Sequence, residues 1–150
     1  MIAFLVILAA AATSPIEEAP LQPWAALVGH CWVGPAPGSQ GSDKHCFESI
    51  LGGQHVRDHH VVTVAGRDVY AGESIYSARG SQVIFTYWNS LGGLGTGTER
   101  VTSDKWHFSG TIHATATSDE EPMTAVWKML PDGYEVTAEG GGARKFTRAD

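Results

Sequence analysis

The sequence contains no run of Lys or Arg and few charges of either sign. Of 150 residues, 10 are Lys or Arg and 16 are Asp or Glu, so the formal net charge is −6 and charged residues make up 17%. Nucleic-acid-binding domains carry a basic patch or stripe, so no nucleic-acid partner is expected. The hydrophobic fraction of 43% excludes a disordered chain. At this length we expect one domain.

The sequence also lacks an apolar run long enough to cross a bilayer as a helix. Its most apolar segment, residues 1–12, is uncharged, too short to span, and ends in the pattern Ala10-x-Ala12. It predicts a secretory signal peptide without the usual basic start. A buried N-terminal helix or an uncleaved anchor is the alternative. We therefore expect a periplasmic or secreted protein without a membrane span after cleavage, an extended leader over residues 13–23, and one domain over residues 24–150.

There are only two cysteines, Cys31 and Cys46. In an exported protein an even number of cysteines favours a disulfide. Such a bond would close a loop of about 15 residues and stabilise the fold by roughly 3 kcal/mol. The alternative is a metal site that also uses His30 and His45, because each cysteine follows a histidine. That spacing matches no common structural zinc motif.

Amphipathic helical runs are missing as well, apart from one turn near Trp24, whereas there are 18 glycines. Short β-prone runs alternate with Gly, Pro, Asp and Ser, and residues 82–90 are the richest in β-branched and aromatic types. About ten strands joined by short turns predict an antiparallel meander. Closing the sheet removes its edges, so we predict an all-β, up-and-down barrel of about 8–10 strands. A β-sandwich is the alternative.

The segment from Leu27 to Gly34 (L-V-G-H-C-W-V-G) resembles the opening strand of the calycin superfamily. Lipocalin-like members of that superfamily begin with Gly-x-Trp, and here the spacing from Gly29 to Trp32 is one residue longer. The strand pattern of the rest of the chain is similar to that of small bacterial lipocalin-like and nitrobindin-like barrels. The resemblance implies a barrel that binds a small hydrophobic molecule or haem.

The hairpin from His45 to Val64, which turns through Gly52-Gly53, carries the densest set of ionisable groups. Asp58 and His60 share a face with three valines, so we expect both to point inward. A buried Asp and a buried His need to pair with each other or with a partner such as Arg. These side chains then orient a ligand; alternatively, they lie in solvent at the barrel mouth.

Five further residues are candidates for the lining of the barrel. Glu73 lies among apolar neighbours, Tyr87 and Asn89 share a face with Phe85, and Trp127 shares a face with two methionines. We expect an aromatic pocket with a few polar groups. Ordinary core packing with satisfied hydrogen bonds is the alternative.

Seven histidines invite a metal or haem hypothesis. Adjacent His59 and His60 point to opposite faces of a strand, and no strand carries a His-x-His pair on one face. We therefore predict no metal site. No cofactor is expected, although a haem held by His107 or His113 as the single axial ligand is an alternative.

Together these features predict an exported, lipocalin-like barrel that binds a small, mostly apolar or amphipathic molecule in its interior. The alternative is an enzyme that uses Glu73, or Asp58 with His60, as general base. No G-x-S-x-G sequence supports nucleophilic catalysis.

Overall fold

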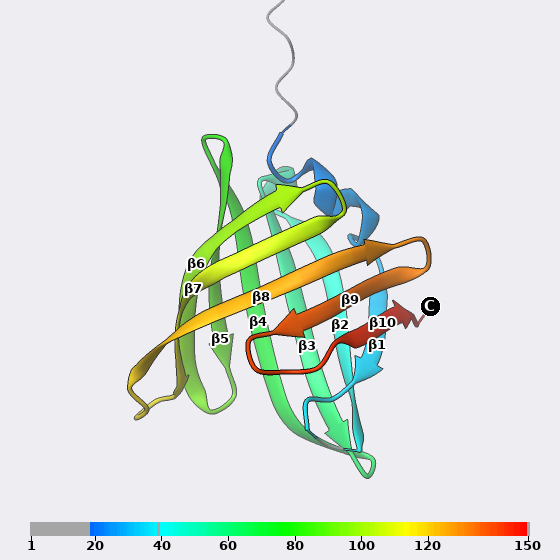
Figure 1. The fold of residues 1–150 in the computed structure, drawn as a ribbon, viewed down its shortest axis with the longest axis vertical. Coiled ribbons are helices and arrows are strands. Elements are labelled where there is room, and N and C mark those ends of the chain that lie inside the picture. The colour runs from blue at the N-terminus through cyan, green and yellow to red at the C-terminus, as the bar shows by residue number, and fades with distance from the viewer. Residues whose placement is uncertain (1–18, 39, 150) are drawn as a thin grey trace, which may run out of the picture.

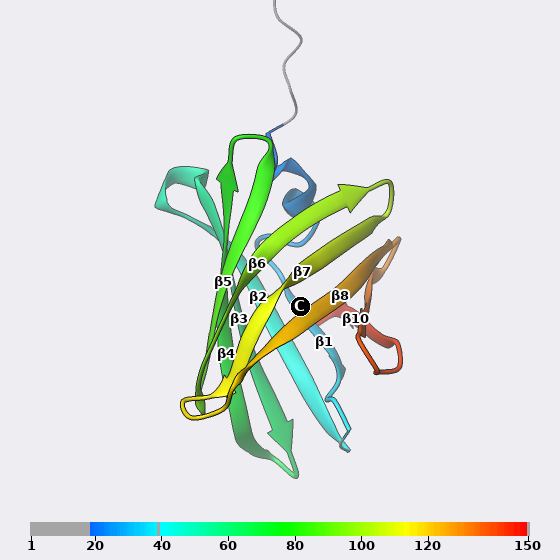
Figure 2. The ribbon, with the colours of Figure 1, turned by 60° about the vertical axis from the view of Figure 1, so that its left-hand side comes forward.

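The computed structural model describes residues 19–38 and 40–149 as a closed β-barrel (Figures 1 and 2). The predicted signal peptide and the start of the leader therefore lie outside the described residues. Ten antiparallel strands are joined in chain order, and the last strand pairs with the first to close the sheet. The predicted all-β meander is confirmed. The strands are β1 (Cys31–Pro35), β2 (Gly41–Ile50), β3 (His55–Val64), β4 (Arg67–Arg79), β5 (Gln82–Asn89), β6 (Gly92–Thr102), β7 (Lys105–Thr115), β8 (Glu120–Leu130), β9 (Gly133–Ala138) and β10 (Arg144–Arg148).

Tight turns set the registers of the long central hairpins. Between β3 and β4, Ala65 and Gly66 both have positive φ, 51° and 74°, which is the conformation of a type I′ hairpin turn. Between β2 and β3, the short 3-10 segment η2 (Leu51–Gly53) makes the turn that the glycines predict. Because side chains alternate along a strand, each register fixes which residues point into the barrel.

A second 3-10 segment, η1 (Gln22–Ala26), closes one end of the barrel (Figure 1). Pro23 lies at its start, where a missing backbone N–H costs nothing. Gln22 and Pro23 are therefore helical rather than part of an extended leader. Trp24 is fully buried, and its ring lies 4.0 Å from the ring of Tyr76 and 4.7 Å from that of Trp106. This segment is a plug.

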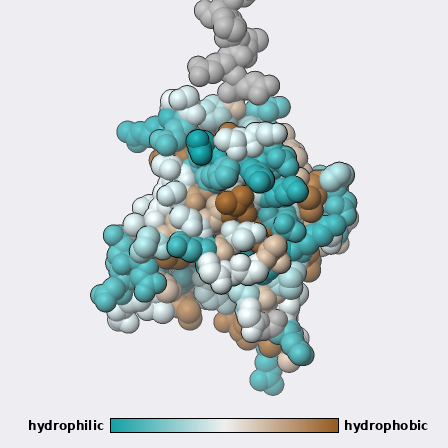
Figure 3. Space-filling model, in the orientation of Figure 1, coloured by the Kyte–Doolittle hydropathy of each residue, from teal (hydrophilic) through white to brown (hydrophobic). Residues whose placement is uncertain are grey.

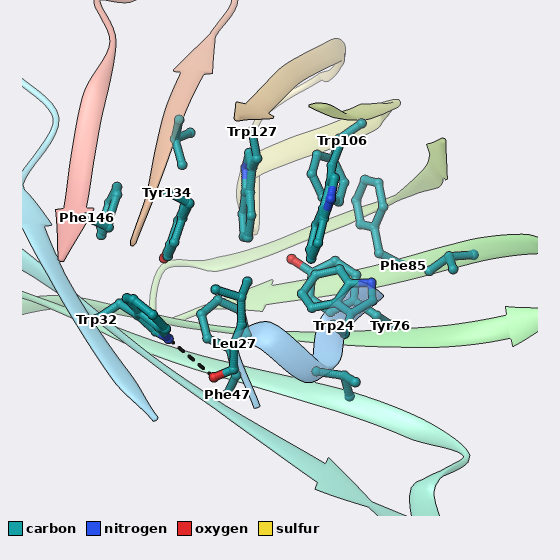
Figure 4. Close-up of a cluster of buried hydrophobic side chains, with 14 residues drawn as sticks. Trp24, Leu27, Trp32, Phe47, Tyr76, Phe85, Trp106, Trp127, Tyr134 and Phe146 are labelled. Atoms are coloured by element: carbon teal, nitrogen blue, oxygen red, sulfur yellow. Dashed lines mark hydrogen bonds between the residues drawn. The ribbon is translucent and has the colours of Figure 1, made fainter. Parts of the chain in front are cut away.

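Next to the plug, the barrel is filled by aromatic side chains from almost every strand (Figure 4). Trp127 stacks on Tyr134 at 5.0 Å, and Tyr134 stacks on Phe146 at 4.9 Å. Trp32 donates a hydrogen bond from Nε1 to the carbonyl of Leu27 at 3.2 Å, which ties β1 to the chain that follows the plug. On the face drawn in Figure 3, by contrast, hydrophobic residues form separate patches among hydrophilic ones.

Cys31 and Cys46 are direct partners in the pairing of β1 with β2 and form a disulfide. The predicted disulfide is confirmed, and the alternative Cys/His metal site is excluded because both thiols are used. A cross-link at this point joins the first strand of the barrel to the hairpin that carries the densest set of ionisable groups. It is compatible with an oxidising compartment.

We predict that Glu99 makes the stability of this protein depend on pH. Glu99 is buried against the plug, where its Oε2 accepts a hydrogen bond from Trp24 Nε1 at 3.0 Å. Burial raises the pKa of Glu99 to about 7, although the bond from Trp24 opposes the rise. The folded protein thus holds this proton more tightly than the unfolded chain. The stabilisation is complete below the unfolded pKa near 4.5 and is lost as the pH rises through 7.

The size of the effect is on the order of 3 kcal/mol between pH 4.5 and pH 8. Urea unfolding of wild type and Glu99→Gln at several pH values measures it, because the difference between the two proteins isolates this one group. The free energy of unfolding of the variant should increase relative to that of wild type as the pH rises. Parallel curves would contradict the assignment.

Candidate functional site

The interior of the barrel beyond the aromatic core contains two adjoining chambers. The outer chamber has a volume of about 390 Å³ and the inner chamber about 260 Å³. The inner chamber is bounded by Tyr76, which packs against the plug, so the outer chamber lies toward the opposite end. The two chambers are neighbours, because they share five lining residues: His45, His60, Tyr70, Tyr87 and Trp127.

One wall of the chambers is built by the β2–β3 hairpin. Its register pairs His45 with His60 and Phe47 with Asp58, and all four point into the barrel. Asp43 lies two residues before His45 and therefore shares its face. Two carboxylates and two imidazoles thus meet inside the barrel, although they are up to 17 residues apart in sequence.

Each carboxylate contacts an imidazole from the opposite strand. His45 Nδ1 lies 2.8 Å from Asp58 Oδ2, and His60 Nδ1 lies 3.0 Å from Asp43 Oδ1. His45 Nε2 is also 3.3 Å from Asp43 Oδ1, and the two imidazole rings stack at 4.6 Å. Arg144 on β10 completes the cluster by donating from NH1 to Asp43 Oδ2 at 3.2 Å. Of the two ways in which Asp58 and His60 were expected to be compensated, the structure has the second: they do not pair with each other, and Asp58 contacts His45 whereas His60 contacts Asp43.

These contacts keep His45 and Asp43 ionised. Burial alone would lower the pKa of His45, but the charge of Asp58 and the hydrogen bonds with Asp43 and Asp58 raise it to about 9. Burial would also raise the pKa of Asp43. Its hydrogen bonds with the two histidines and the attraction between the charges hold that pKa well below its usual range. The Asp43 carboxylate therefore lies between two cations, the His45 imidazolium and the Arg144 guanidinium.

Two tyrosines extend the hydrogen-bonded chain. Tyr87 OH lies 3.3 Å from His60 Nε2 and is also hydrogen-bonded to Tyr70 OH. Burial, followed by the bond to Tyr70, raises the pKa of Tyr87. Gly72 leaves room for this contact, because a Cβ there would lie 2.3 Å from His60 Nε2 and 2.6 Å from Tyr87 OH. A side chain at position 72 would push the two apart.

The remaining walls are apolar. Phe85, Phe108, Met123 and Ala125 line the inner chamber, and Trp127 lines both. Asp58 is only 2% exposed and also lines the inner chamber, yet its Oδ1 has no hydrogen-bond partner among the described residues. Leaving a buried carboxylate oxygen unpaired is unfavourable. That oxygen itself has almost no accessible surface, so a donor in the chamber would reach it only after the surrounding side chains move.

The structure brings together five of the seven residues that the sequence predicts as the lining: Asp58, His60, Phe85, Tyr87 and Trp127. Glu73 is a correction. It lies on the outer face of β4, with 42% of its side chain exposed, 3.7 Å from His59 Nδ1. The apolar neighbours that suggested an inward position are themselves on the outer face, because Tyr70, Gly72 and Ser74 take the inner one.

Asn89 is the second correction. Its Oδ1 accepts hydrogen bonds from the backbone N–H groups of Leu91 and Gly93, and its Nδ2 donates to the carbonyl of Ala114. All of its polar atoms are therefore used to hold the β5–β6 turn, and it lines neither chamber. Asn89 lies on the same face of β5 as Tyr87, as predicted, but it is the last residue of the strand and therefore contacts the turn instead of the chambers.

The two histidines considered as haem ligands lie on the outer face of β7. Trp106, Phe108 and Ile112 fill the inner face, so His107 and His113 alternate with them and point away. His107 Nε2 contacts Thr102 Oγ1, and His113 Nδ1 contacts the carbonyl of Ser118. An interior haem would find neither within reach.

Sequence reasoning missed four residues of the site: Asp43, His45, Tyr70 and Arg144. His45 belongs to the hairpin that the sequence singles out, and a pairing centred on Gly52-Gly53 already places it opposite His60. Tyr70 was assigned to its correct face but not chosen. Nothing local marks Arg144, which meets Asp43 across 101 residues of chain.

A larger hollow of about 620 Å³ lies at the plug end, between the start of the described chain and the ends of β5 and β6. Among the described residues that line it, Glu99 and Arg100 are the only charged ones, and they form no cluster of interacting ionisable groups. The chambers inside the barrel are the better candidate site.

Comparison with known proteins supports the architecture. No protein-family model matches the sequence, and no curated protein matches it either. Among solved structures, the chain is similar to the crystal structure of Rv2717c from M. tuberculosis, with a TM-score of 0.60 and 14% identity. The match covers 87% of this chain and 98% of that one. At this identity the likeness shows the fold alone. In residues 19–38 and 40–149, no helix is long and apolar enough to cross a membrane.

We predict that Asp43→Asn destabilises the protein by about 3 kcal/mol, because it removes the carboxylate that Arg144 and His60 contact and leaves His45 with Asp58 alone. Asp132→Asn is the matched control: Asp132 also pairs with a cation, Lys145, at 2.8 Å, but both side chains are largely exposed. It should leave the urea midpoint unchanged. Equal effects of the two substitutions would show that the interior cluster contributes nothing beyond a surface ion pair.

Proposed function

We propose that this protein is an exported binding barrel that holds a small amphipathic molecule in the two chambers. The observation that carries the proposal is the division of one cavity into an aromatic wall and a polar wall. Binding sites for small molecules combine mostly apolar linings with a few placed polar groups. The apolar part of the ligand packs between Trp127 and Phe85, and its polar end reaches Tyr87 and His60.

Export is part of the proposal and has two supports. The Cys31–Cys46 disulfide is compatible with an oxidising compartment, and the apolar segment 1–12 has the composition of a signal peptide. N-terminal sequencing of the protein recovered from outside the cytoplasm tests it. A mature N-terminus at Thr13 is expected, whereas an intact Met1 would contradict cleavage.

Native mass spectrometry of the purified protein, run beside a denatured sample with an absorption spectrum, tests for a ligand directly. A copurified mass that is lost on denaturation would support the proposal and give the class of ligand. A Soret band would identify that ligand as haem instead of an ordinary amphipathic molecule. If the protein carries no copurified mass and also fails to bind the amphipathic dye anilinonaphthalene sulfonate, the proposal of a binding barrel is rejected.

We predict that Ala125→Leu blocks the inner chamber. Ala125 lines that chamber, so three added carbon atoms fill part of a volume of about 260 Å³. The affinity for anilinonaphthalene sulfonate, an amphipathic dye, should fall at least about tenfold, measured by fluorescence titration. Val126→Leu is the matched control, because the neighbouring position on β8 faces outward. Equal affinities of the two variants would place the dye elsewhere.

The polar wall is tested by a second pair of substitutions. Tyr87→Phe removes the hydroxyl that links His60 to Tyr70, whereas Glu73→Ala removes a carboxylate from the outer face of the barrel. We expect Tyr87→Phe to weaken binding of the sulfonate dye about five-fold to tenfold, the range for one lost hydrogen bond. Glu73→Ala should bind as wild type does. A loss confined to Glu73→Ala would reverse the assignment of the two faces.

A further inference from the structure

We propose that Asp43, His45 and His60 form a binding site for one divalent first-row transition-metal ion on the polar wall of the outer chamber. Their candidate ligand atoms all lie within 4.8 Å of one another. This site goes beyond the proposed function and does not depend on it. No single strand carries a His-x-His pair on one face, but these three ligands come together across the pairing of β2 with β3.

The geometry fits a single ion. Asp43 Oδ1 lies 3.3 Å from His45 Nε2 and 3.0 Å from His60 Nδ1. Two atoms each about 2.0–2.1 Å from one ion are about 3.3 Å apart at a tetrahedral angle and about 3.0 Å apart at a right angle. The His45 and His60 rings are tilted by only 16° from parallel, so one ring must turn about its side-chain bonds before both nitrogen lone pairs point at the same centre.

Each of the three ligands is already held by a second residue through an atom that does not bind the ion. His45 Nδ1 contacts Asp58, His60 Nε2 contacts Tyr87, and the second carboxylate oxygen of Asp43 accepts from Arg144. Metal-binding histidines in proteins are oriented by such partners, most often a carboxylate or a carbonyl on the other ring nitrogen. A cluster assembled only to neutralise charge would not require this complete outer shell.

Charge and ligand type select the ion. Metal binding displaces one ring proton of His45, whose pKa without metal is about 9, so the affinity for the ion should rise with pH. With both imidazoles then neutral, the carboxylates of Asp43 and Asp58 outnumber Arg144 by one negative charge, so a dication leaves a small positive charge. Two imidazoles and one carboxylate suit Zn²⁺, Fe²⁺, Co²⁺ or Ni²⁺, whereas Mg²⁺ and Ca²⁺ prefer oxygen ligands alone. All three residues line the outer chamber, so the remaining coordination positions face a cavity of about 390 Å³. An anionic group on a molecule in that chamber would reach the ion.

Titration of chelator-treated protein with Zn²⁺, followed by calorimetry, tests the site without any organic ligand. We expect one ion per chain, and an affinity at least about a hundredfold lower in His60→Gln than in wild type, because a direct ligand costs more than the 10–100-fold of an orienting partner. His59→Gln is the matched control: His59 is adjacent in sequence, also lies near a carboxylate, and points outward with half of its side chain exposed. Its affinity should be unchanged.

Absence of stoichiometric binding, or equal binding by His60→Gln and His59→Gln, would overturn the proposal. Far-UV circular dichroism and urea midpoints of both variants show whether lost binding reflects lost folding. Should His60→Gln unfold, X-ray absorption of the wild-type Zn²⁺ complex still decides, because the site requires two imidazoles and no sulfur. The dye titrations are made without metal, so the two proposals fail separately.

Discussion

The polar wall depends on one constraint: two carboxylates are buried side by side in the barrel, and neither can stay ionised without a cation beside it. Burying an isolated carboxylate is very unfavourable, and breaking a buried ion pair typically costs 3–5 kcal/mol. Asp58 is compensated by His45, and Asp43 by His45, His60 and Arg144. Arg144 comes from the last strand and Asp43 from the second, and β1 pairs with both of these strands, so the Arg144–Asp43 contact requires the closed barrel.

The opposite end of the barrel solves a different problem. Ten strands enclose more space than their own side chains fill at that end, and η1 supplies the missing volume with Trp24, which contacts aromatic rings from five other positions. Glu99 satisfies the indole N–H there. With one end closed by packing, the chambers extend from Tyr76 toward the other end, where Asp43, Tyr70 and Arg144 gather. The asymmetry of the barrel thus gives the cavity one apolar floor and one polar wall.

The fold was predictable because turn residues and strand alternation are local signals, and both are strong in this sequence. The site was predictable only where the faces of a strand differ clearly. On β3, three valines identify the inner face and carry Asp58 and His60 with them. On β4, the inner face carries Tyr70, Gly72 and Ser74, because these residues surround the polar cluster. This face is less apolar than the outer one. The rule that the more apolar face of a strand points inward therefore selects the face of Glu73, which is the wrong one. The contact of Arg144 with Asp43 depends on closure between distant strands, which no local pattern encodes.

The similarity to Rv2717c extends over 87% of this chain at 14% identity, so the barrel persists where most side chains differ. Side chains that the barrel does not need for its own packing are therefore the ones that indicate a site. A barrel of this kind needs apolar inward residues, and replacing a buried ionised cluster by hydrophobic side chains of similar volume is often neutral or stabilising in proteins. It also does not need Gly72, whose absent side chain admits His60 and Tyr87 to the same spot. The two chambers are lined by the inward charged side chains and by the residues that contact them. That arrangement is what favours a binding role over a barrel filled only by its own side chains.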